Sequence, residues 1–127
     1  MIKGITLGSI SIDCKNPVRL STFYSDMLGW RKDEMYGSPV VVSEEGVTLL
    51  FLEADDFVYQ PPVWPEEEGK QQKQIHFDFV VDDLSSAIIE AEILGAYKAP
   101  QQYGGDDFVT MIDPEGHVFC LCAKDSV

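Results

Sequence analysis

The sequence contains one internal repeat, and this repeat constrains the fold more than any other feature. Residues 9–30 (SISIDCKNPVRLSTFYSDMLGW) parallel residues 76–96 (HFDFVVDDLSSAIIEAEILGA). Each copy has the pattern of an alternating strand, a polar helix cap and an amphipathic helix that ends in Leu-Gly. Self-similarity of this kind indicates two copies of one supersecondary unit.

Cap signals mark the ends of both predicted helices. Asn16 is a favourable N-cap, and Pro17 suits the first helical position because an N–H there would have no helical partner. Asp83 is the equivalent N-cap of the second copy. Gly29 and Gly95 follow the helical spacing and are typical of left-handed C-caps. Both copies are therefore predicted to continue from strand into helix.

Three further strands are predicted after each helix. Short strands are expected at 30–35 and 96–100, and residues 38–53 and 107–122 each have the pattern of a strand, a turn and a strand. The segment between the copies contains PPVWPEEEGKQQ, which is too proline-rich for a strand interior. We therefore predict a single α+β domain over residues 1–127, with module one at 1–54, a linker at 55–73 and module two at 74–127.

Alternation on the first strand of each module separates two faces. Apolar residues at every second position predict the face that contacts the helix: Ile10, Ile12 and Cys14 in module one, and Phe77, Phe79 and Val81 in module two. Polar residues point to the other face: Ser9, Ser11 and Asp13, and His76 and Asp78. That face is either an ordinary solvated sheet surface or one wall of a cleft.

Composition excludes several functions. The 127 residues include 22 acidic and 9 basic side chains, a net charge of −13, which would repel nucleic acid. No apolar run is long enough to span a membrane, and no signal peptide is evident, so we expect a cytoplasmic protein without membrane contact. The three cysteines, Cys14, Cys120 and Cys122, form no CxxC pair, and buried free thiols are the simpler interpretation.

The paired β-α-β-β-β halves resemble the vicinal oxygen chelate superfamily, which includes glyoxalase I, extradiol dioxygenases, fosfomycin-resistance enzymes and bleomycin-resistance proteins. The resemblance covers nearly the whole chain. It rests on Phe23-Tyr24 followed by Leu28-Gly29-Trp30, on HFDFVVDD (76–83) and on DPEGHVFCL (113–121). It implies two modules that form a curved eight-stranded mixed sheet around a cleft, with one helix per module on the outer face. The motifs resemble most closely the glyoxalase-like subgroup.

The same resemblance implies four positions that can supply metal ligands, at Ser9, near Leu50, at His76 and at Cys120. Only His76 is the residue type that the family pattern expects. A catalytic divalent ion needs three or more oxygen or nitrogen ligands, so we predict no metal cofactor, and a divalent ion is the disfavoured alternative. Glu53, Asp13 and Asp78 are the acids left open as substitutes.

Two residues have open roles. His76 is the best catalytic candidate, either as a general base oriented by Asp78 or Asp13, or as a hydrogen-bonded histidine that fixes a ligand. Trp64, held between prolines, is expected either to stack on a flat ligand or to pin the linker to a sheet.

The function predicted from these observations is a glyoxalase-like protein that binds a small organic molecule in the inter-module cleft without a catalytic metal. The alternative is a metal-dependent or His76-assisted lyase, isomerase or dioxygenase. By analogy with relatives, we expect a homodimer. The residues predicted to line the cleft are Ser9, Ser11, Asp13, Leu50, Trp64, His76, Asp78 and Cys120.

Overall fold

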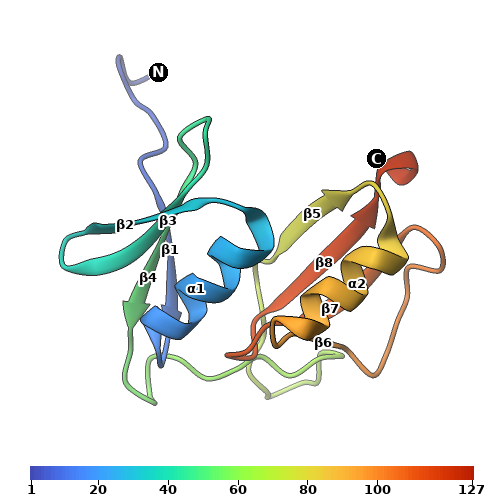
Figure 1. Cartoon of the computed structure of the whole chain (residues 1–127). Helices are drawn as coiled ribbons and strands as arrows, with labels where there is room; N and C mark the ends of the chain where they lie inside the picture. Colours follow the sequence, from blue (N-terminus) through green and yellow to red (C-terminus); the bar gives the residue numbers. More distant parts are fainter. The chain divides into compact units, whose positions relative to one another are not determined.

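The repeat seen in the sequence becomes two units of the same topology. A computed structural model describes residues 1–127, which divide into the compact units Met1–Tyr59 and Gln60–Val127. Each unit has the element order β-α-β-β-β and one four-stranded mixed sheet (Figure 1). The α+β class and the tandem modules are therefore confirmed, with the eight predicted strands present as two sheets of four.

The first unit has the strand order β1-β4-β3-β2. Strands β1 and β4 are parallel, and the other neighbours are antiparallel. Its elements are β1 (Ile10–Cys14), α1 (Pro17–Leu28), β2 (Arg31–Met35), β3 (Ser38–Val42) and β4 (Thr48–Glu53).

Helix α1 begins and ends where its cap signals predict. The Asn16 side chain accepts a hydrogen bond from the Arg19 N–H at 3.0 Å, and Pro17 is the first helical residue. Gly29 adopts the left-handed conformation (φ 70°, ψ 21°), and its N–H donates to the Ser25 carbonyl. These caps satisfy backbone groups that the helix itself leaves unpaired.

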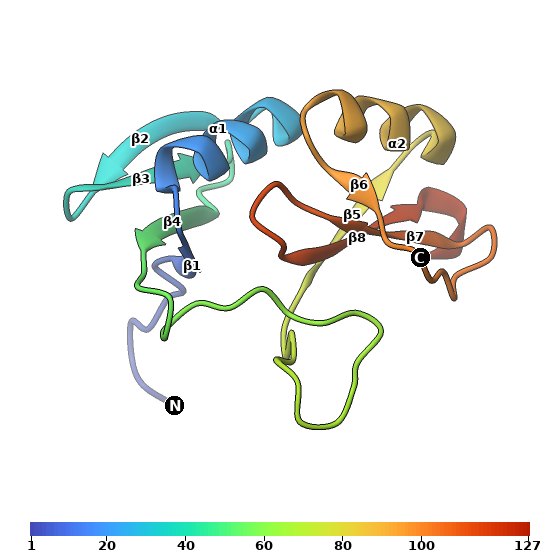
Figure 2. The same cartoon turned by 90° about the horizontal axis from the view of Figure 1, so that it is seen from below.

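The core of the first unit lies between α1 and one face of its sheet (Figure 2). Tyr24 stacks on Phe51 of β4 at 5.8 Å between ring centroids, and Phe23 meets Tyr24 edge-on. Leu20 and Phe51 are fully buried. Cys14 of β1 is fully buried as well, and Ile10 and Ile12 are half-buried, whereas Ser11 and Asp13 are exposed. The predicted division of β1 into an apolar and a polar face is confirmed.

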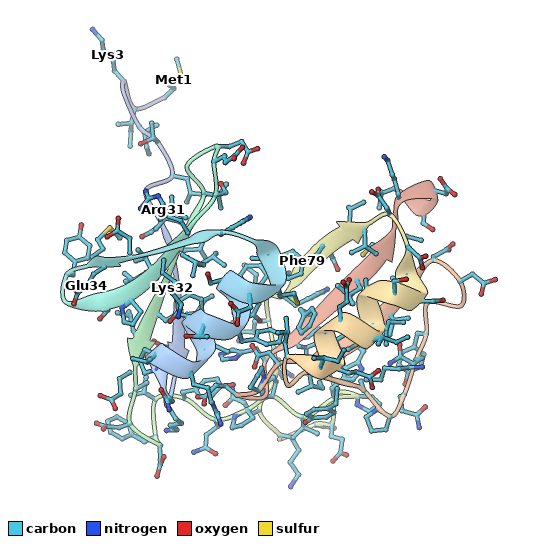
Figure 3. The ribbon with its side chains drawn as sticks, viewed as in Figure 1. Met1, Lys3, Arg31, Lys32, Glu34 and Phe79 are labelled. Carbon is cyan, nitrogen blue, oxygen red and sulfur yellow. The ribbon has the colours of Figure 1, made fainter.

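Strand β2 is an edge strand with mostly charged side chains. Arg31, Lys32 and Glu34 lie along it (Figure 3), and Arg31 pairs with Asp33 at 2.6 Å. Charges on an edge strand discourage pairing with another chain. The strand begins at Arg31 rather than at the predicted Trp30. The Trp30 carbonyl instead accepts a hydrogen bond from the Ser25 hydroxyl of α1.

The second unit repeats this arrangement. Its strand order is β5-β8-β7-β6, with β5 and β8 parallel and the other neighbours antiparallel. Its elements are β5 (Phe77–Val81), α2 (Leu84–Ile93), β6 (Tyr97–Lys98), β7 (Phe108–Ile112) and β8 (Val118–Ala123), followed by a short 3-10 helix (Lys124–Ser126).

Two boundaries in this unit differ from the prediction. The C-cap of α2 is Leu94, and Gly95 follows it with φ 115°. Strand β6 has two residues instead of the predicted five. The Ala96 N–H closes the end of α2 by donating to the Ala91 carbonyl, and Pro100 has no N–H to offer a ladder. Both ends of the predicted strand are thus lost to local backbone constraints.

Helix α2 packs against β8 on one face of the second sheet. Phe79 of β5 meets Phe119 of β8 at 5.9 Å between ring centroids, and Phe77 contacts Phe79. Phe119 and Met111 are fully buried. Neither helix is long and apolar enough to cross a membrane.

Candidate functional site

A nitrogen, an oxygen and a sulfur donor meet on the second sheet. Asp78 of β5 lies directly opposite Cys120 of β8 in the parallel ladder, and His76 precedes β5 by one residue. Neighbouring residues in register point to the same face of a sheet, and so do residues two apart on one strand. The donor atoms of His76, Asp78 and Cys120 consequently all lie within 4.8 Å of one another.

His76 and Asp78 form the polar part of this cluster. The imidazole Nε2 lies 3.2 Å from the Asp78 carboxylate, and the two side chains are 32% and 59% exposed. They alternate with Phe77 and Phe79, whose rings belong to the aromatic contacts with β8. The pair therefore lies on the helix-free face of the sheet, where solutes can reach it.

Two thiols lie beside the pair. Cys120 is buried and is 3.7 Å from the Thr110 hydroxyl, and the Cys122 thiol is 4.0 Å from the Asp78 carboxylate. Burial raises the pKa of Cys120, a hydrogen bond with Thr110 opposes this rise, and the Asp78 charge adds to it. Burial also raises the pKa of Cys122, again with a contribution from Asp78. Both thiols are therefore protonated at neutral pH and poorly nucleophilic.

The Gln102 side chain fixes the strand that holds Thr110. Its amide nitrogen donates to the carbonyls of Ala99 and Thr110, and its oxygen accepts from the Thr110 N–H at 2.8 Å. Next to it, Gly104 is required by close packing, because a Cβ there would lie 2.3 Å from the Phe108 carbonyl oxygen. Gln102 was not predicted from the sequence. No motif around it indicates that its side-chain amide binds backbone groups in the way a neighbouring strand would.

A second histidine–carboxylate pair has a structural role. Asp113 is buried in the β7–β8 turn and lies 2.9 Å from Nδ1 of His117. It also accepts hydrogen bonds from the N–H groups of Glu115 and His117. The sequence predicts this turn, but it gives no sign that His117 packs against its carboxylate.

The other predicted site residues lie elsewhere. Ser9, Ser11, Asp13 and Leu50 belong to the first unit, where Ser11 pairs with Leu50 and Asp13 pairs with Leu52. Trp64 belongs to the second unit and packs against Ala99, Ile112 and Val118. This contact pins the linker to the second sheet, while a ligand contact of Trp64 stays a prediction.

The residues present do not fit the metal site that the family resemblance implies. Leu50 offers no ligand atom, and Ser9 offers only a hydroxyl. Glu53 pairs with Cys14, so it lies on the opposite face from Leu50 and cannot replace it. These four positions therefore do not form a complete set of metal ligands in this chain.

Solved structures share this fold. A glyoxalase/bleomycin resistance protein/dioxygenase family enzyme from Burkholderia phytofirmans PsJN matches with a TM-score of 0.65 at 16% identity, over 91% of this chain and 96% of its own. A genomically encoded fosfomycin resistance protein from Listeria monocytogenes matches with a TM-score of 0.66 at 16% identity, over 97% and 92%. An antibiotic binding protein from Streptomyces sp. CB03234 matches with a TM-score of 0.60 at 12% identity, over 97% and 98%. A search of the curated proteins found no match.

Tandem β-α-β-β-β modules, each with one helix-covered sheet face, define the class as the vicinal oxygen chelate fold, and the resemblance seen in the sequence is confirmed. The family model for the glyoxalase-like domain matches residues 9–122. The chain therefore belongs to the glyoxalase-like domain family.

Proposed function

We propose that this protein binds a small organic molecule on the helix-free face of its second sheet, without a catalytic metal. The observation that carries the proposal is the His76–Asp78 pair. Its two polar groups are 3.2 Å apart, accessible, and set beside the apolar and thiol side chains of the second sheet. Ligand sites commonly combine apolar walls with a few such polar groups.

Three further observations support a binding role. The residues at the implied metal positions of the first unit, Ser9 and Leu50, are poor ligands. Both thiols near His76 are held protonated, so no activated nucleophile stands beside it. One protein of the same fold is itself described as an antibiotic binding protein. At 12% identity this likeness concerns the fold and leaves the ligand of our chain open.

A thermal-shift screen tests the proposal. The full-length protein is melted with a library of flat aromatic and heteroaromatic compounds, with and without a chelator. A compound at ~100 times its dissociation constant adds ~2.7 kcal/mol to the free energy of unfolding. We expect stabilisation that persists in the chelator. The proposal fails if no compound stabilises the protein, or if every stabilisation disappears with chelation.

Substitution of His76 locates the site. For a compound found in the screen, His76→Ala should weaken binding about tenfold, because a ligand hydrogen bond is worth ~1 kcal/mol or more. Ser85→Ala is the matched control, since Ser85 is exposed on α2, which covers the other face of the same sheet. Equal affinities of the two variants would place the ligand elsewhere.

The close approach of His76 and Asp78 also favours a second candidate function. A carboxylate that orients an imidazole is the arrangement of a general base, so a His76-assisted lyase or isomerase is the alternative. Turnover of a compound from the screen, lost in both His76→Ala and Asp78→Asn, would support the enzyme over the binding protein.

A further inference from the structure

The first unit contains a cavity of about 460 Å³ at one end of its sheet. The loop that joins α1 to β2 forms one side of the cavity, and the turn that joins β3 to β4 forms the other. Its wall includes Leu28, Trp30, Arg31, Val42, Glu44 and Glu45. Ligand pockets usually have volumes of ~300–1,000 Å³. We propose that this cavity binds a small organic ammonium ion, that is, a protonated amine with an apolar body.

The two sides of the cavity meet because β2 and β3 are antiparallel neighbours. Arg31 is the first residue of β2, and it pairs with Val42, the last residue of β3. Figure 3 labels Arg31 at this end of the strand. The chain that leaves α1 therefore enters the sheet beside the point where the β3–β4 turn leaves it.

Trp30 gives the cavity an aromatic wall. The Ser25 hydroxyl donates a hydrogen bond to the Trp30 carbonyl at 2.7 Å, so the backbone just after α1 is held in place. Trp30 is half-buried, and its ring has no contact with another aromatic ring. The π-electrons of an indole attract ammonium groups more strongly than those of the other aromatic side chains.

A closed turn presents the two glutamates on the opposite side. The Gly46 N–H donates to the Ser43 carbonyl at 3.0 Å, which makes Glu44 and Glu45 the central residues of a β-turn. The buried Ser43 hydroxyl accepts a hydrogen bond from the Val47 N–H at 2.9 Å. The backbone beneath both carboxylates is thus ordered before a ligand arrives, which lowers the entropic cost of binding.

The charges around the cavity favour a cation. Glu44 and Glu45 are exposed, and neither side chain forms an ion pair or a hydrogen bond. Arg31 is the one basic residue of the wall, and its guanidinium is paired with Asp33 at 2.6 Å. The carboxyl end of α1 adds partial negative charge, and no basic residue in its last turn offsets it. Two carboxylates and a helix end therefore remain uncompensated.

The apolar part of the wall selects for a hydrocarbon body. Leu28 and Val42 are half-buried beside the Trp30 ring, so a bare inorganic cation would leave these surfaces in water. An organic anion would be repelled by both glutamates. An ammonium ion with an apolar body uses all three kinds of contact. The inference goes beyond the proposed function, because the cavity belongs to Met1–Tyr59 and the His76–Asp78 pair to Gln60–Val127.

An NMR titration tests the site. The isotope-labelled full-length protein is titrated with cyclohexylmethylammonium, with its neutral counterpart cyclohexylmethanol, and with ammonium chloride, all at matched ionic strength. We expect saturable shifts of the Trp30 indole N–H and of the Gly29 and Glu45 amides with cyclohexylmethylammonium, at a dissociation constant of ~1 mM or lower. The other two compounds should bind at least about tenfold more weakly. Absence of saturable shifts at these residues, or an equal response to either comparison compound, would overturn the proposal.

Variants assign the contacts, with binding read at the Gly29 amide. The double substitution Glu44→Gln/Glu45→Gln should weaken cyclohexylmethylammonium binding about fivefold. Trp30→Leu keeps an apolar side chain without a π-system and should weaken it about threefold.

Glu67→Gln/Glu68→Gln is the matched control, because it removes the same number of charges from exposed residues of the linker. This control should bind as the parent protein does. Glu44 and Glu45 are exposed, so their variant keeps the test valid even if Trp30→Leu fails to fold. Equal affinities of the two double variants would show attraction to the overall charge alone and would refute the site, as would unchanged binding in Trp30→Leu.

The outcome is separable from that of the proposed function. The titration is read at residues of the first unit, whereas the compound screen is assigned through His76 in the second unit. Failure of one measurement therefore leaves the other intact.

Discussion

At the scale of single residues, Asp113 organises the turn between β7 and β8. Its buried carboxylate accepts hydrogen bonds from two backbone N–H groups and lies 2.9 Å from the His117 ring. Asp113→Ala should lower the free energy of unfolding by ~2–4 kcal/mol, because these donors would lose their acceptor inside the protein. Urea denaturation measures the change.

The matched control for this prediction is Asp106→Ala. Asp106 lies in an exposed loop of the same unit, and removal of a surface carboxylate changes stability by no more than ~0.5 kcal/mol. A loss of equal size in both variants would show that Asp113 contributes through charge alone.

Single residues also show how much of the candidate site could be predicted from the sequence. Alternation along residues 76–81 placed His76 and Asp78 on one face, because strand geometry alone decides this. The position of Cys120 opposite Asp78 depends on the parallel register of β5 and β8, which joins residues far apart in the chain. No local pattern specifies such a register, so Cys120 could be predicted near His76 only through the family resemblance.

At the scale of elements, the C-cap of α1 tests how much the left-handed backbone conformation contributes to stability. Gly29 has a positive φ of 70°, a conformation that side chains with a Cβ rarely adopt, although nothing lies within 4 Å of a Cβ placed there. Gly29→Ala should therefore lower the free energy of unfolding by ~1 kcal/mol through backbone strain alone. Chemical denaturation provides the measurement.

Gly8→Ala is the control for this substitution. A Cβ at Gly8 would also meet open space, but Gly8 does not have a positive φ. Its replacement should leave stability unchanged or raise it slightly, because alanine restricts the unfolded chain. If the two variants behave alike, the conformation of Gly29 is not what stabilises the end of the helix.

The linker shows that packing contacts outside helices and strands cannot be predicted from sequence periodicity. Its prolines correctly exclude it from the strands, yet its packing on the second sheet has no periodic signature. Trp64 contacts Ala99, Ile112 and Val118, lies edge-on to Tyr103, and has the Lys73 ammonium 4.5 Å from its ring centroid. Apart from Lys73, these partners lie outside the linker, so only the folded structure identifies them.

Trp64 should accordingly stabilise the fold. Trp64→Ala is expected to cost ~1–3 kcal/mol, less than for a fully buried tryptophan because the side chain is only half-buried. Trp64→Phe should cost less, since it keeps most of the ring and removes the buried indole N–H, which has no hydrogen-bond partner. Thermal denaturation compares the two.

Phe57→Ala serves as the exposed aromatic control. The Phe57 side chain is 86% exposed, so its loss should be nearly neutral. A Trp64→Phe variant less stable than Trp64→Ala would contradict the packing role of the ring.

At the scale of the whole molecule, the excess of acid sets the response to salt. The chain carries a net charge of −13, and ion pairs such as Lys15–Asp56 and Lys124–Asp82 are largely exposed and contribute little. Repulsion among the remaining carboxylates disfavours the compact state. Screening should therefore raise the melting temperature by about 2–5 °C between ~10 mM and ~0.3 M NaCl.

A variant with fewer negative charges tests whether repulsion among carboxylates causes this response to salt. Glu67 and Glu68 are exposed members of the Glu66–Glu68 run, and the double substitution Glu67→Gln/Glu68→Gln removes two negative charges from the linker. The variant should start from a higher melting temperature at low salt and gain less from added NaCl, because less repulsion remains to be screened. A melting temperature that falls with salt in the parent protein would mean that attractive pairs outweigh the repulsion. In that case the acidic excess would act on solubility and on the attraction of cations, not on folding.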